Sequence, residues 1–439
     1  MSADQPRRVR ALILAESCNP DWVSVPLVGW SHYQALARIA DVHLVTQVRN
    51  RPALERAGLV EGRDMTCIDS EAIARPVHRL AEALRGGAGR GWATVTATRV
   101  LSTPYFEWLL WRRFRADLEN RRWDLVHQLT PLSPVVPALT APRCAKIGVP
   151  FCWGPLNGGV PWPPGFDDVR RAEGDHLWTL RPLHRFVPGH RASREAASAL
   201  LIASRATWEQ VEPRWLAKCE YLPENAIDPA RFNRVRYRKA GRPIRAAFVG
   251  RLVPYKGPDM LLDACEPLLR DGSLELLVVG DGPMGPWLKE QVGRRGLQHA
   301  VELAGWVEHQ VVQDRLADCD LFAFPSIHEF GGGVVLEAMA LGVVPIVVDY
   351  GGPAEFVTDR CGWRVPIGSR EQIVAGFRAT LRRACEDPQE IEARSVQALR
   401  RAREQFTWDA KARQTLAVWN WVLGRGPKPG FPMPAPDLS

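Results

Sequence analysis

Short apolar runs alternate with helical segments twice along the chain, and this alternation restricts the fold more than any other feature. The first series contains RVRALILAE, DVHLVTQV, WDLVHQL, KIGVPFCWG and AASALLIAS, and the second contains IRAAFVG, LELLVVG, AVELAGW, DLFAFPS, VVPIVVD and GWRVP. Runs that are apolar throughout are typical of parallel strands covered by helices on both faces. The sequence therefore predicts two α/β domains, and a chain of 439 residues is long enough for both.

The two series are separated by a polar stretch with three prolines, LPENAIDPARFNRVRYRKAGRP. It predicts an N-terminal domain over residues 1–225, a linker over 226–243 and a C-terminal domain over 244–423. The last helix of that span is a candidate for packing back on the N-terminal domain. Residues 424–439 are rich in Pro and Gly, which favours disorder.

Composition indicates a cytoplasmic, globular protein. Hydrophobic residues make up 46% of the chain and charged residues 24%, and no run of 18 apolar residues predicts a transmembrane helix. The first apolar run, ALILA, is too short for a secretion signal. Nine cysteines without a C-x-x-C pair argue against a disulfide framework and a zinc site. A net charge of +8 is compatible with anionic partners.

The stretch HEFGGGVVLEAMALG places two glutamates, Glu329 and Glu337, eight positions apart around a glycine loop. The stretch predicts a strand end, a loop that carries Glu329, and a helix that carries Glu337 and stops at Gly342. Glycines allow a ligand close to the backbone, and helix N-terminal amides favour a diphosphate. Carboxylates accept hydrogen bonds from sugar hydroxyls, so this pattern is compatible with a nucleotide sugar. A helix-capping role for the acids is the structural alternative.

A second motif, AAFVGRLVPYKGPDMLLDA, places Arg251 and Lys256 between a predicted strand and a predicted helix. Both cations would lie at the carboxyl end of a strand in the same domain, where they could bind phosphate. Solvated surface cations are the alternative interpretation.

The motifs GRLVPYKG, VVGDGP, AGWV and the E-x7-E pair follow one another in an order that resembles the retaining glycosyltransferases of family 4, which have the GT-B fold. The specific resemblance covers about residues 244–365. It implies two Rossmann-like doubly wound domains that face each other across a cleft. It also implies metal-independent transfer of a hexose from a donor such as a UDP- or GDP-sugar, without a bound cofactor.

The resemblance implies roles for matching positions. Arg251 and Lys256 would bind the donor diphosphate, Glu329 the transferred sugar and Glu337 the ribose. Donor contacts are also implied for Phe330, Gly331, Gly332, Gly333, Val334, Gly282, Trp306 and Val307. His127 would reach the donor sugar as a catalytic residue. The chain reads EFGGG where many relatives read E-G-F-G, so its sugar preference is open.

The N-terminal half is expected to bind the acceptor. WGPLNGG resembles a glycine-rich segment of some relatives, so Asn157, Gly158 and Gly159 are candidates for the acceptor side, and a plain turn is the alternative. Residues 75–122 contain ten arginines among aromatic residues. This composition suits either the inner face of an anionic membrane with a lipid-linked acceptor, or an amphipathic helix packed on its own sheet. No nucleic-acid motif accompanies the charge.

Three alternatives remain. The loop Gly280, Gly282 and Gly285 reads G-x-G-x-x-G after a strand, as in dehydrogenases that bind NAD, and Glu302 follows at about the expected distance. A glycosidase also needs two carboxylates. A GT-B protein that binds a nucleotide sugar without catalysis would retain the same residues.

Overall fold

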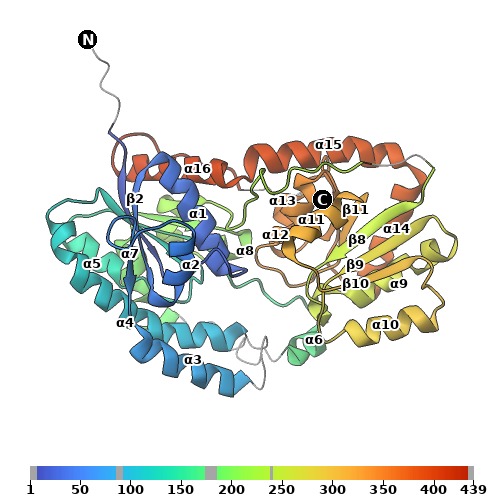
Figure 1. Ribbon diagram of the computed structural model, residues 1–439, viewed down its shortest axis with the longest axis horizontal. Coiled ribbons are helices and arrows are strands. Elements are labelled where there is room, and N and C mark those ends of the chain that lie inside the picture. Colours follow the sequence, from blue (N-terminus) through green and yellow to red (C-terminus); the bar gives the residue numbers. More distant parts are fainter. Residues whose placement is uncertain (1–6, 86–91, 174–184, 238–240, 434–439) are drawn as a thin grey trace, which may run out of the picture. The chain divides into compact units, whose positions relative to one another are not determined.

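The computed structural model describes residues 7–85, 92–173, 185–237 and 241–433, and the chain divides into two compact units. Unit 1 consists of Met1–Gly158, Gly174–Glu224 and Trp408–Ser439. Unit 2 consists of Gly159–Glu173 and Asn225–Thr407. Each unit is an α/β structure built around one parallel sheet, as the sequence predicts (Figure 1).

Unit 1 contains a seven-stranded sheet in the order β3-β2-β1-β4-β5-β6-β7, and every neighbouring pair is parallel. Its strands are β1 (Arg10–Ala15), β2 (Asp41–Gln47), β3 (Met65–Ile68), β4 (Leu125–Thr130), β5 (Phe151–Leu156), β6 (Ala199–Ile202) and β7 (Cys219–Tyr221). Its α-helices are α1 (Val25–Ile39), α2 (Arg51–Arg56), α3 (Glu71–Arg85), α4 (Trp92–Glu119), α5 (Thr140–Lys146), α7 (His190–Ala196), α8 (Arg205–Trp208) and α16 (Trp408–Val422).

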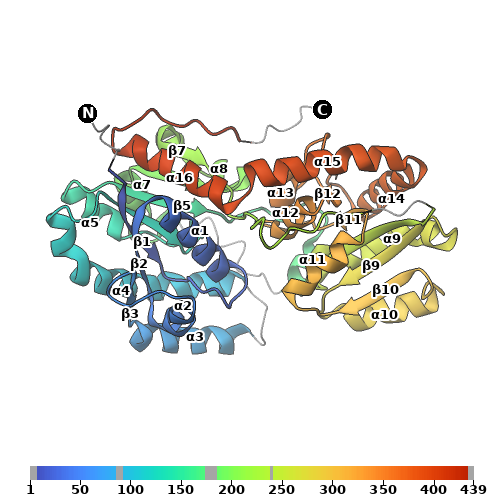
Figure 2. The same cartoon turned by 45° about the horizontal axis from the view of Figure 1, so that its top comes forward.

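The two faces of this sheet form two separate cores because successive residues of β1 point in opposite directions. Ala11 and Ile13 pack with residues of α1 and α16, which lie against each other (Figure 2). Leu12 and Leu14 pack with residues of α4 and α5. Helix α4 contributes Phe106, Leu110, Phe114 and Leu118 to this second core.

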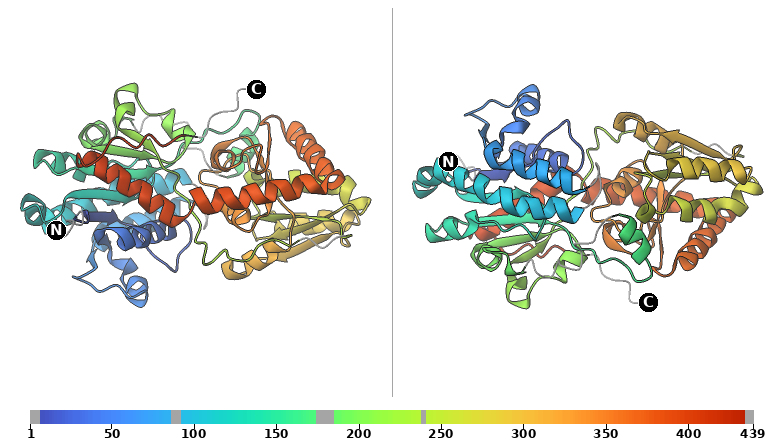
Figure 3. Two further views of the ribbon diagram at one scale, coloured as in Figure 1. Left: turned by 90° about the horizontal axis from the view of Figure 1, so that it is seen from above. Right: turned by 90° about the horizontal axis from the view of Figure 1, so that it is seen from below.

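Unit 2 contains a six-stranded sheet in the order β10-β9-β8-β11-β12-β13, again parallel throughout. Its strands are β8 (Ile244–Val249), β9 (Leu274–Val279), β10 (Val301–Gly305), β11 (Leu321–Phe324), β12 (Val344–Val348) and β13 (Trp363–Val365). Its α-helices are α6 (Asp167–Ala172), α9 (Pro258–Arg270), α10 (Gly285–Arg294), α11 (His309–Ala317), α12 (Gly333–Ala340), α13 (Gly351–Phe356), α14 (Arg370–Glu386) and α15 (Pro388–Gln405). Helix α15, red in Figure 3, packs on α12 and α14.

Short 3-10 helices among the described residues include η1 (Val48–Asn50) and η3 (Pro213–Lys218) in unit 1, and η4 (Pro254–Lys256) in unit 2. The last of these carries one of the predicted phosphate ligands. All eleven strand-like runs of the two predicted series contain a strand, whereas the sequence did not predict the short edge strands β3 and β7.

The segment 226–243 is not a free linker. Ile227 and Phe232 belong to the core of unit 2, and the Ile227 amide donates to the Phe406 carbonyl. Arg236 is buried, and its guanidinium lies 3.1 Å from Asp320 and 2.7 Å from Glu392. The basic residues looked like solvent-exposed linker because their acidic partners lie about 80 to 160 positions away in the sequence. Residues 238–240 of this segment lie outside the described residues.

Elsewhere, Gly159–Glu173 groups with unit 2, whereas the prediction placed this segment in the N-terminal domain. The last helix, α16, groups with unit 1 and packs on α1, which is the packing named as a candidate for that helix. The predicted disorder is wrong for residues 428–431, because Lys428 pairs with Glu220 and the Phe431 amide donates to the same carboxylate. Residues 434–439 lie outside the described part of the chain.

Two predicted properties concern the whole chain. All nine cysteines are free, and seven are buried. Among the described residues, no helix combines the length and the apolar composition that crossing a membrane requires.

The burial of Arg236 yields a stability prediction. Asp320→Ala leaves this guanidinium, 2% exposed, without its fully buried partner. We expect the free energy of unfolding to fall by about 3 kcal/mol, because a buried charge loses its counter-ion. Asp318→Ala removes an exposed partner of Arg234 and is the matched control, with an expected loss below about 1 kcal/mol. Urea denaturation of both variants measures the difference, and equal losses would contradict a buried role for this segment.

Candidate functional site

The sheet of unit 2 has a topological switch point between β8 and β11. The chain runs from β8 to β9 and β10 on one side and then returns to β11 on the other. Loops diverge beyond the carboxyl ends of the two strands at such a point, and ligands of open α/β sheets bind there. The loops concerned are residues 250–257 after β8 and residues 325–332 after β11, and these loops contain Arg251, Lys256 and Glu329.

The structure brings two predicted site residues into contact. The Lys256 ammonium Nζ lies 2.8 Å from Glu329 Oε2, and the two side chains are only 16% and 21% exposed. The same ammonium lies 5.2 Å from the centre of the Phe324 ring. An ion pair with this little solvent is held more strongly than a surface pair. The carboxylate predicted for a sugar and the cation predicted for a phosphate are therefore partners of each other.

The two loops also bind each other through the backbone. The Ile327 amide donates to the Tyr255 carbonyl at 2.9 Å. Gly257 has a φ of 68°, and a Cβ atom there would lie 2.8 Å from the Pro325 carbonyl oxygen. Only glycine tolerates both the positive φ and this close approach. The glycine of YKG thus lets the lysine loop lie directly on the glutamate loop.

The chain after β12, at the start of α13, binds the backbone of Glu329. The Gly352 amide donates to the Glu329 carbonyl at 3.1 Å. Cβ atoms on Gly351 and Gly352 would lie 2.5 Å from the Glu329 oxygen and 2.2 Å from the Phe330 oxygen. These two glycines are required because the chain after β12 crosses the glutamate loop at backbone contact distance. Both ends of Glu329, its carbonyl and its carboxylate, are fixed.

The glycine loop leads into α12 as predicted. Gly332 caps the helix with a φ of 57°, and the helix runs over Gly333–Ala340 and is followed by Gly342 with a φ of 77°. Glu337 lies in its second turn and is half-buried, as are Gly333 and Val334. Gly331 is buried, and the Phe330 ring lies edge-on to His328 with 5.1 Å between ring centres. The helix α12 therefore begins four residues after Glu329 along the chain.

The remaining predicted donor residues lie at the carboxyl ends of neighbouring strands. Arg251 is exposed in the loop after β8, and Gly282 follows β9. Trp306 and Val307 follow β10, with Trp306 72% exposed and Val307 partly buried. An exposed indole at a strand end can stack on a planar ring.

The glycines of the predicted dinucleotide loop lie against the backbone of the loop that follows β8. A Cβ atom on Gly280 would lie 1.9 Å from the Gly250 carbonyl oxygen, and one on Gly282 would lie 2.5 Å from the Leu252 oxygen. This loop follows β9, not β8, so it lies one strand away from the switch point. Glu302 is used in ion pairs with Arg245 and Arg315. The glycines serve close packing between adjacent loops.

His127 belongs to unit 1 and is fully buried in β4. Its Nε2–H donates to the Gly154 carbonyl at 2.8 Å, and its Nδ1 accepts from the Trp419 indole at 3.0 Å. Burial lowers the pKa of His127 to about 4. A neutral imidazole with both nitrogens engaged inside the unit has no atom left for a substrate. The predicted catalytic role is therefore not compatible with this geometry, which is that of a structural histidine.

The predicted acceptor-side residues separate between the units. Asn157 and Gly158 follow β5 in unit 1, and Gly159 groups with unit 2. The Asn157 carboxamide accepts from Ser204, and the Gly158 amide donates to the Thr207 hydroxyl. These contacts fix the loop on the N-terminus of α8. They are compatible with the plain-turn alternative, and the acceptor role stays a prediction.

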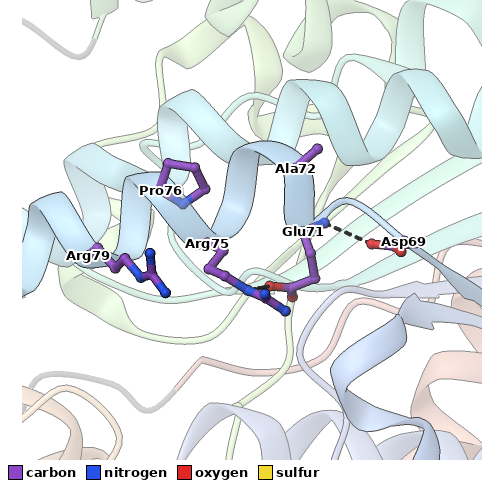
Figure 4. Close-up of a pocket in the computed structure, with 6 residues that line it drawn as sticks. All are labelled: Asp69, Glu71, Ala72, Arg75, Pro76 and Arg79. Carbon is purple, nitrogen blue, oxygen red and sulfur yellow. Dashed lines mark hydrogen bonds and ion pairs between the residues drawn. The ribbon is translucent and has the colours of Figure 1, made fainter.

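A surface hollow of unit 1 lies on α3 rather than at any predicted site residue. It is lined by Asp69, Glu71, Ala72, Arg75, Pro76 and Arg79 (Figure 4). Arg75 lies 3.5 Å from Glu71, so the charges largely satisfy one another. Within the described residues, no three His, Cys, Asp or Glu side chains gather as metal ligands would.

Three residues around Glu329 were not predicted. His328 is buried and stacks on Trp162 with ring centres 4.0 Å apart. Tyr255 is edge-on to the same indole, and burial, together with the nearby Glu329 and Glu173 carboxylates, raises the pKa of its phenol. Trp162 lies more than 90 positions before the loops that it contacts, so no local pattern indicates it. His328, adjacent to Glu329, was the one available signal.

Comparisons with known proteins find similar sequences and structures. Residues 230–397 match the family described as "Glycosyl transferases group 1". The alpha-D-kanosaminyltransferase of Streptomyces kanamyceticus is 28% identical over 190 residues, which are 40% of this chain and 49% of that protein. The D-inositol 3-phosphate glycosyltransferase of Jonesia denitrificans is 34% identical over 181 residues, 39% and 42% of the two chains. The chain spans about half or less of the length of these curated relatives.

Solved structures with the same fold extend over nearly the whole chain. Anabaena HepE, solved in complex with UDP, has a TM-score of 0.58 at 16% identity and covers 93% of this chain and 98% of its own. A glycosyltransferase from Rickettsia africae has a TM-score of 0.59 at 11% identity, with 96% and 100% covered. The predicted GT-B fold class is confirmed by these neighbours, and residues 230–397 are similar to the glycosyl transferases group 1.

The buried imidazole of His127 gives a pH prediction. Its pKa is about 4 when folded and ordinarily 6.5, so the unfolded chain binds more protons between these pH values. The free energy of unfolding should therefore fall as the pH drops from 6.5 towards 4, by about 3 kcal/mol from this group. His127→Gln can keep both hydrogen bonds without titrating, so its unfolding should depend less on pH.

Urea denaturation at pH 4.5, 5.5 and 7 checks this prediction. His299→Gln, at an exposed position in unit 2, is the matched control and should unfold like the wild type at each pH. A His127→Gln protein that is folded and has lost activity more than a hundredfold would restore the catalytic role.

Proposed function

We propose that the protein is a retaining glycosyltransferase that transfers a hexose from a nucleoside diphosphate sugar to a glycan, lipid-linked or small-molecule acceptor. The observation that carries the proposal is the Lys256–Glu329 pair at the switch point of unit 2. A nucleotide sugar has a diphosphate next to a sugar ring that bears hydroxyl groups. The pair offers a cation for the diphosphate and, next to it, a carboxylate for the hydroxyl groups. The UDP complex of the similarly folded Anabaena HepE supports a nucleoside diphosphate as the ligand.

Each part of the donor has a matching group. Lys256 and Arg251 are the cations for the diphosphate, and the N-terminal amides of α12 would be further donors to it. Glu329 would accept hydrogen bonds from the sugar, and Glu337 from the ribose. Trp306 would stack on the base. When the donor binds, the Glu329 carboxylate would exchange the Lys256 ammonium for sugar hydroxyls. The Lys256 ammonium would in turn pair with the diphosphate.

The transfer needs only groups of this site and the two substrates. The bond from sugar C1 to the phosphate oxygen breaks, and the acceptor oxygen bonds to C1 from the same face. The acceptor proton moves to the departing phosphate oxygen, and the nucleoside diphosphate leaves. Lys256 and Arg251 would stabilise the charge that develops on that phosphate. Neither a metal ion nor a cofactor is part of this proposal.

A peripheral membrane contact is a second proposal, and a surface of α4 supports it. Trp108 is 42% exposed, Tyr105 stacks on it at 5.9 Å, and the Arg112 guanidinium lies 4.8 Å from the centre of the indole. The opposite face of α4 packs on its own sheet, so the packed-helix alternative also holds. Aromatic residues combined with arginines suit an anionic lipid surface, where a lipid-linked acceptor at the inner face of the membrane would be found.

The ion pair predicts opposite effects for its two members. Glu329→Gln should remove the extra affinity for UDP-glucose over UDP, because the carboxylate contact to the sugar is lost. Its affinity for UDP alone should stay constant or rise, up to about tenfold, because Lys256 no longer has a competing carboxylate. Lys256→Ala should weaken UDP binding by about 30-fold, the value of a charge-assisted hydrogen bond.

Calorimetric titrations with UDP and UDP-glucose, and in parallel with GDP and GDP-mannose, measure these differences. Lys289→Ala and Glu290→Gln change exposed charges of the same unit and should bind like the wild type. Loss of sugar transfer with both site variants would support the enzyme, and wild-type binding by both would show that the donor lies elsewhere.

The membrane proposal predicts lipid binding that depends on α4. The wild type should co-sediment with vesicles of phosphatidylcholine and phosphatidylglycerol, and less with pure phosphatidylcholine. Trp108→Ala combined with Arg112→Ala should reduce the bound fraction several-fold, as about 1 kcal/mol per arginine implies. Arg191→Ala, an exposed arginine on α7, is the control. Equal binding to both kinds of vesicle would contradict the proposal.

A further inference from the structure

The segment Gly159–Glu173, called the strap below, packs on unit 2 although the chain before and after it groups with unit 1. Phe166 is 5% exposed within the core of unit 2, and Val169 packs against that core. Helix α6 forms the second half of the strap and contacts the turn Pro254–Lys256 that carries the phosphate-binding lysine. The strap is therefore an integral part of the unit that holds the candidate donor site.

The first half of the strap encloses the residue that precedes Glu329. The Trp162 ring stacks on the His328 ring with 4.0 Å between centres and 8° between planes. His328 Nε2 lies 3.0 Å from the Val160 carbonyl oxygen, to which it donates. The Phe330 ring packs edge-on against the imidazole, with 74° between the ring planes. His328 is thus fixed by stacking, by a hydrogen bond and by an aromatic edge.

The strap also contacts the two other loops of the site. The Tyr350 hydroxyl, just after β12, donates to the Pro161 carbonyl at 2.8 Å. The Trp162 ring is edge-on to Tyr255, the residue before Lys256, with 6.3 Å between centres. The loops after β8, β11 and β12 therefore converge on three consecutive strap residues, Val160, Pro161 and Trp162.

We propose that the strap positions Lys256 and Glu329 for the donor, with Trp162 as the central positioning residue. The proposal rests on the proposed function. Each charged residue directly follows one that contacts Trp162, since Tyr255 precedes Lys256 and His328 precedes Glu329. A shift of His328 after loss of the stack would move the Glu329 carboxylate relative to the ammonium. Shifts of about 1 Å in such groups can reduce rates by about 100-fold.

The test compares three strap variants with a matched control. Trp162→Ala removes both ring contacts and should lower kcat/KM for the nucleotide sugar by about 30- to 100-fold. Trp162→Phe keeps an aromatic face and should stay within about threefold of the wild type. Tyr350→Phe removes one hydrogen bond and should cost about fivefold. Tyr237→Ala removes an exposed aromatic ring from the same unit and should change nothing.

The readouts separate positioning from general damage. Affinity for UDP and for UDP-glucose is measured by calorimetry, kcat and KM by turnover, and folding by thermal melting. Loss of kcat/KM by Trp162→Ala with rescue by Trp162→Phe supports the proposal. If Trp162→Ala does not fold, Tyr350→Phe decides. A fivefold lower kcat/KM with a normal melting temperature supports the proposal, and an unchanged kcat/KM contradicts it.

Different results would overturn the strap proposal and the proposed function. A wild type that binds and turns over nucleotide sugar, with strap variants that do the same, would overturn the strap proposal alone. A wild type that binds no nucleoside diphosphate would overturn the proposed function and the strap proposal with it.

Discussion

The ion pair between Lys256 and Glu329 is the interaction on which the proposed site depends. Two opposite charges with little solvent access remain close only if the backbones that carry them are fixed. The surrounding chain fulfils this requirement. Gly257 allows the two loops to touch, and Gly351 and Gly352 allow a third loop to bind the Glu329 carbonyl. The strap adds aromatic contacts to the residues before each charge. The glycines and aromatic residues of the motifs are therefore explained by the geometry that the two charges need.

The strand order explains why these residues meet at all. Strands β8 and β11 are adjacent in the sheet although β9 and β10 lie between them in the chain. Their loops diverge at the switch point, which leaves room for a ligand beyond the carboxyl ends. The same order explains why the G-x-G-x-x-G match has another role. Its loop follows β9, one strand away, and its glycines are used for contact with residues 250–252.

Local patterns predicted most of the fold. Apolar periodicity found eleven strands, but not β3 and β7, which are short strands at the edges of the unit 1 sheet. The motifs singled out Lys256 and Glu329, but not their contact with each other, which depends on the strand order. His127 looked catalytic because its partners, Gly154 and Trp419, are distant in sequence. Arg236 looked solvent-exposed for the same reason. Trp162 could not be predicted, since its role exists only through chain segments far along the sequence.

The most direct measurement is a calorimetric titration of the wild-type protein with UDP, GDP, ADP and NAD under identical conditions. We expect one nucleoside diphosphate to bind selectively and NAD not to bind. The switch point of unit 2 offers cations and a carboxylate, whereas Gly280 and Gly282 lie against the backbone of residues 250–252. Binding of NAD without binding of any nucleoside diphosphate would contradict the proposed donor site, because the bound ligand would then be a dinucleotide.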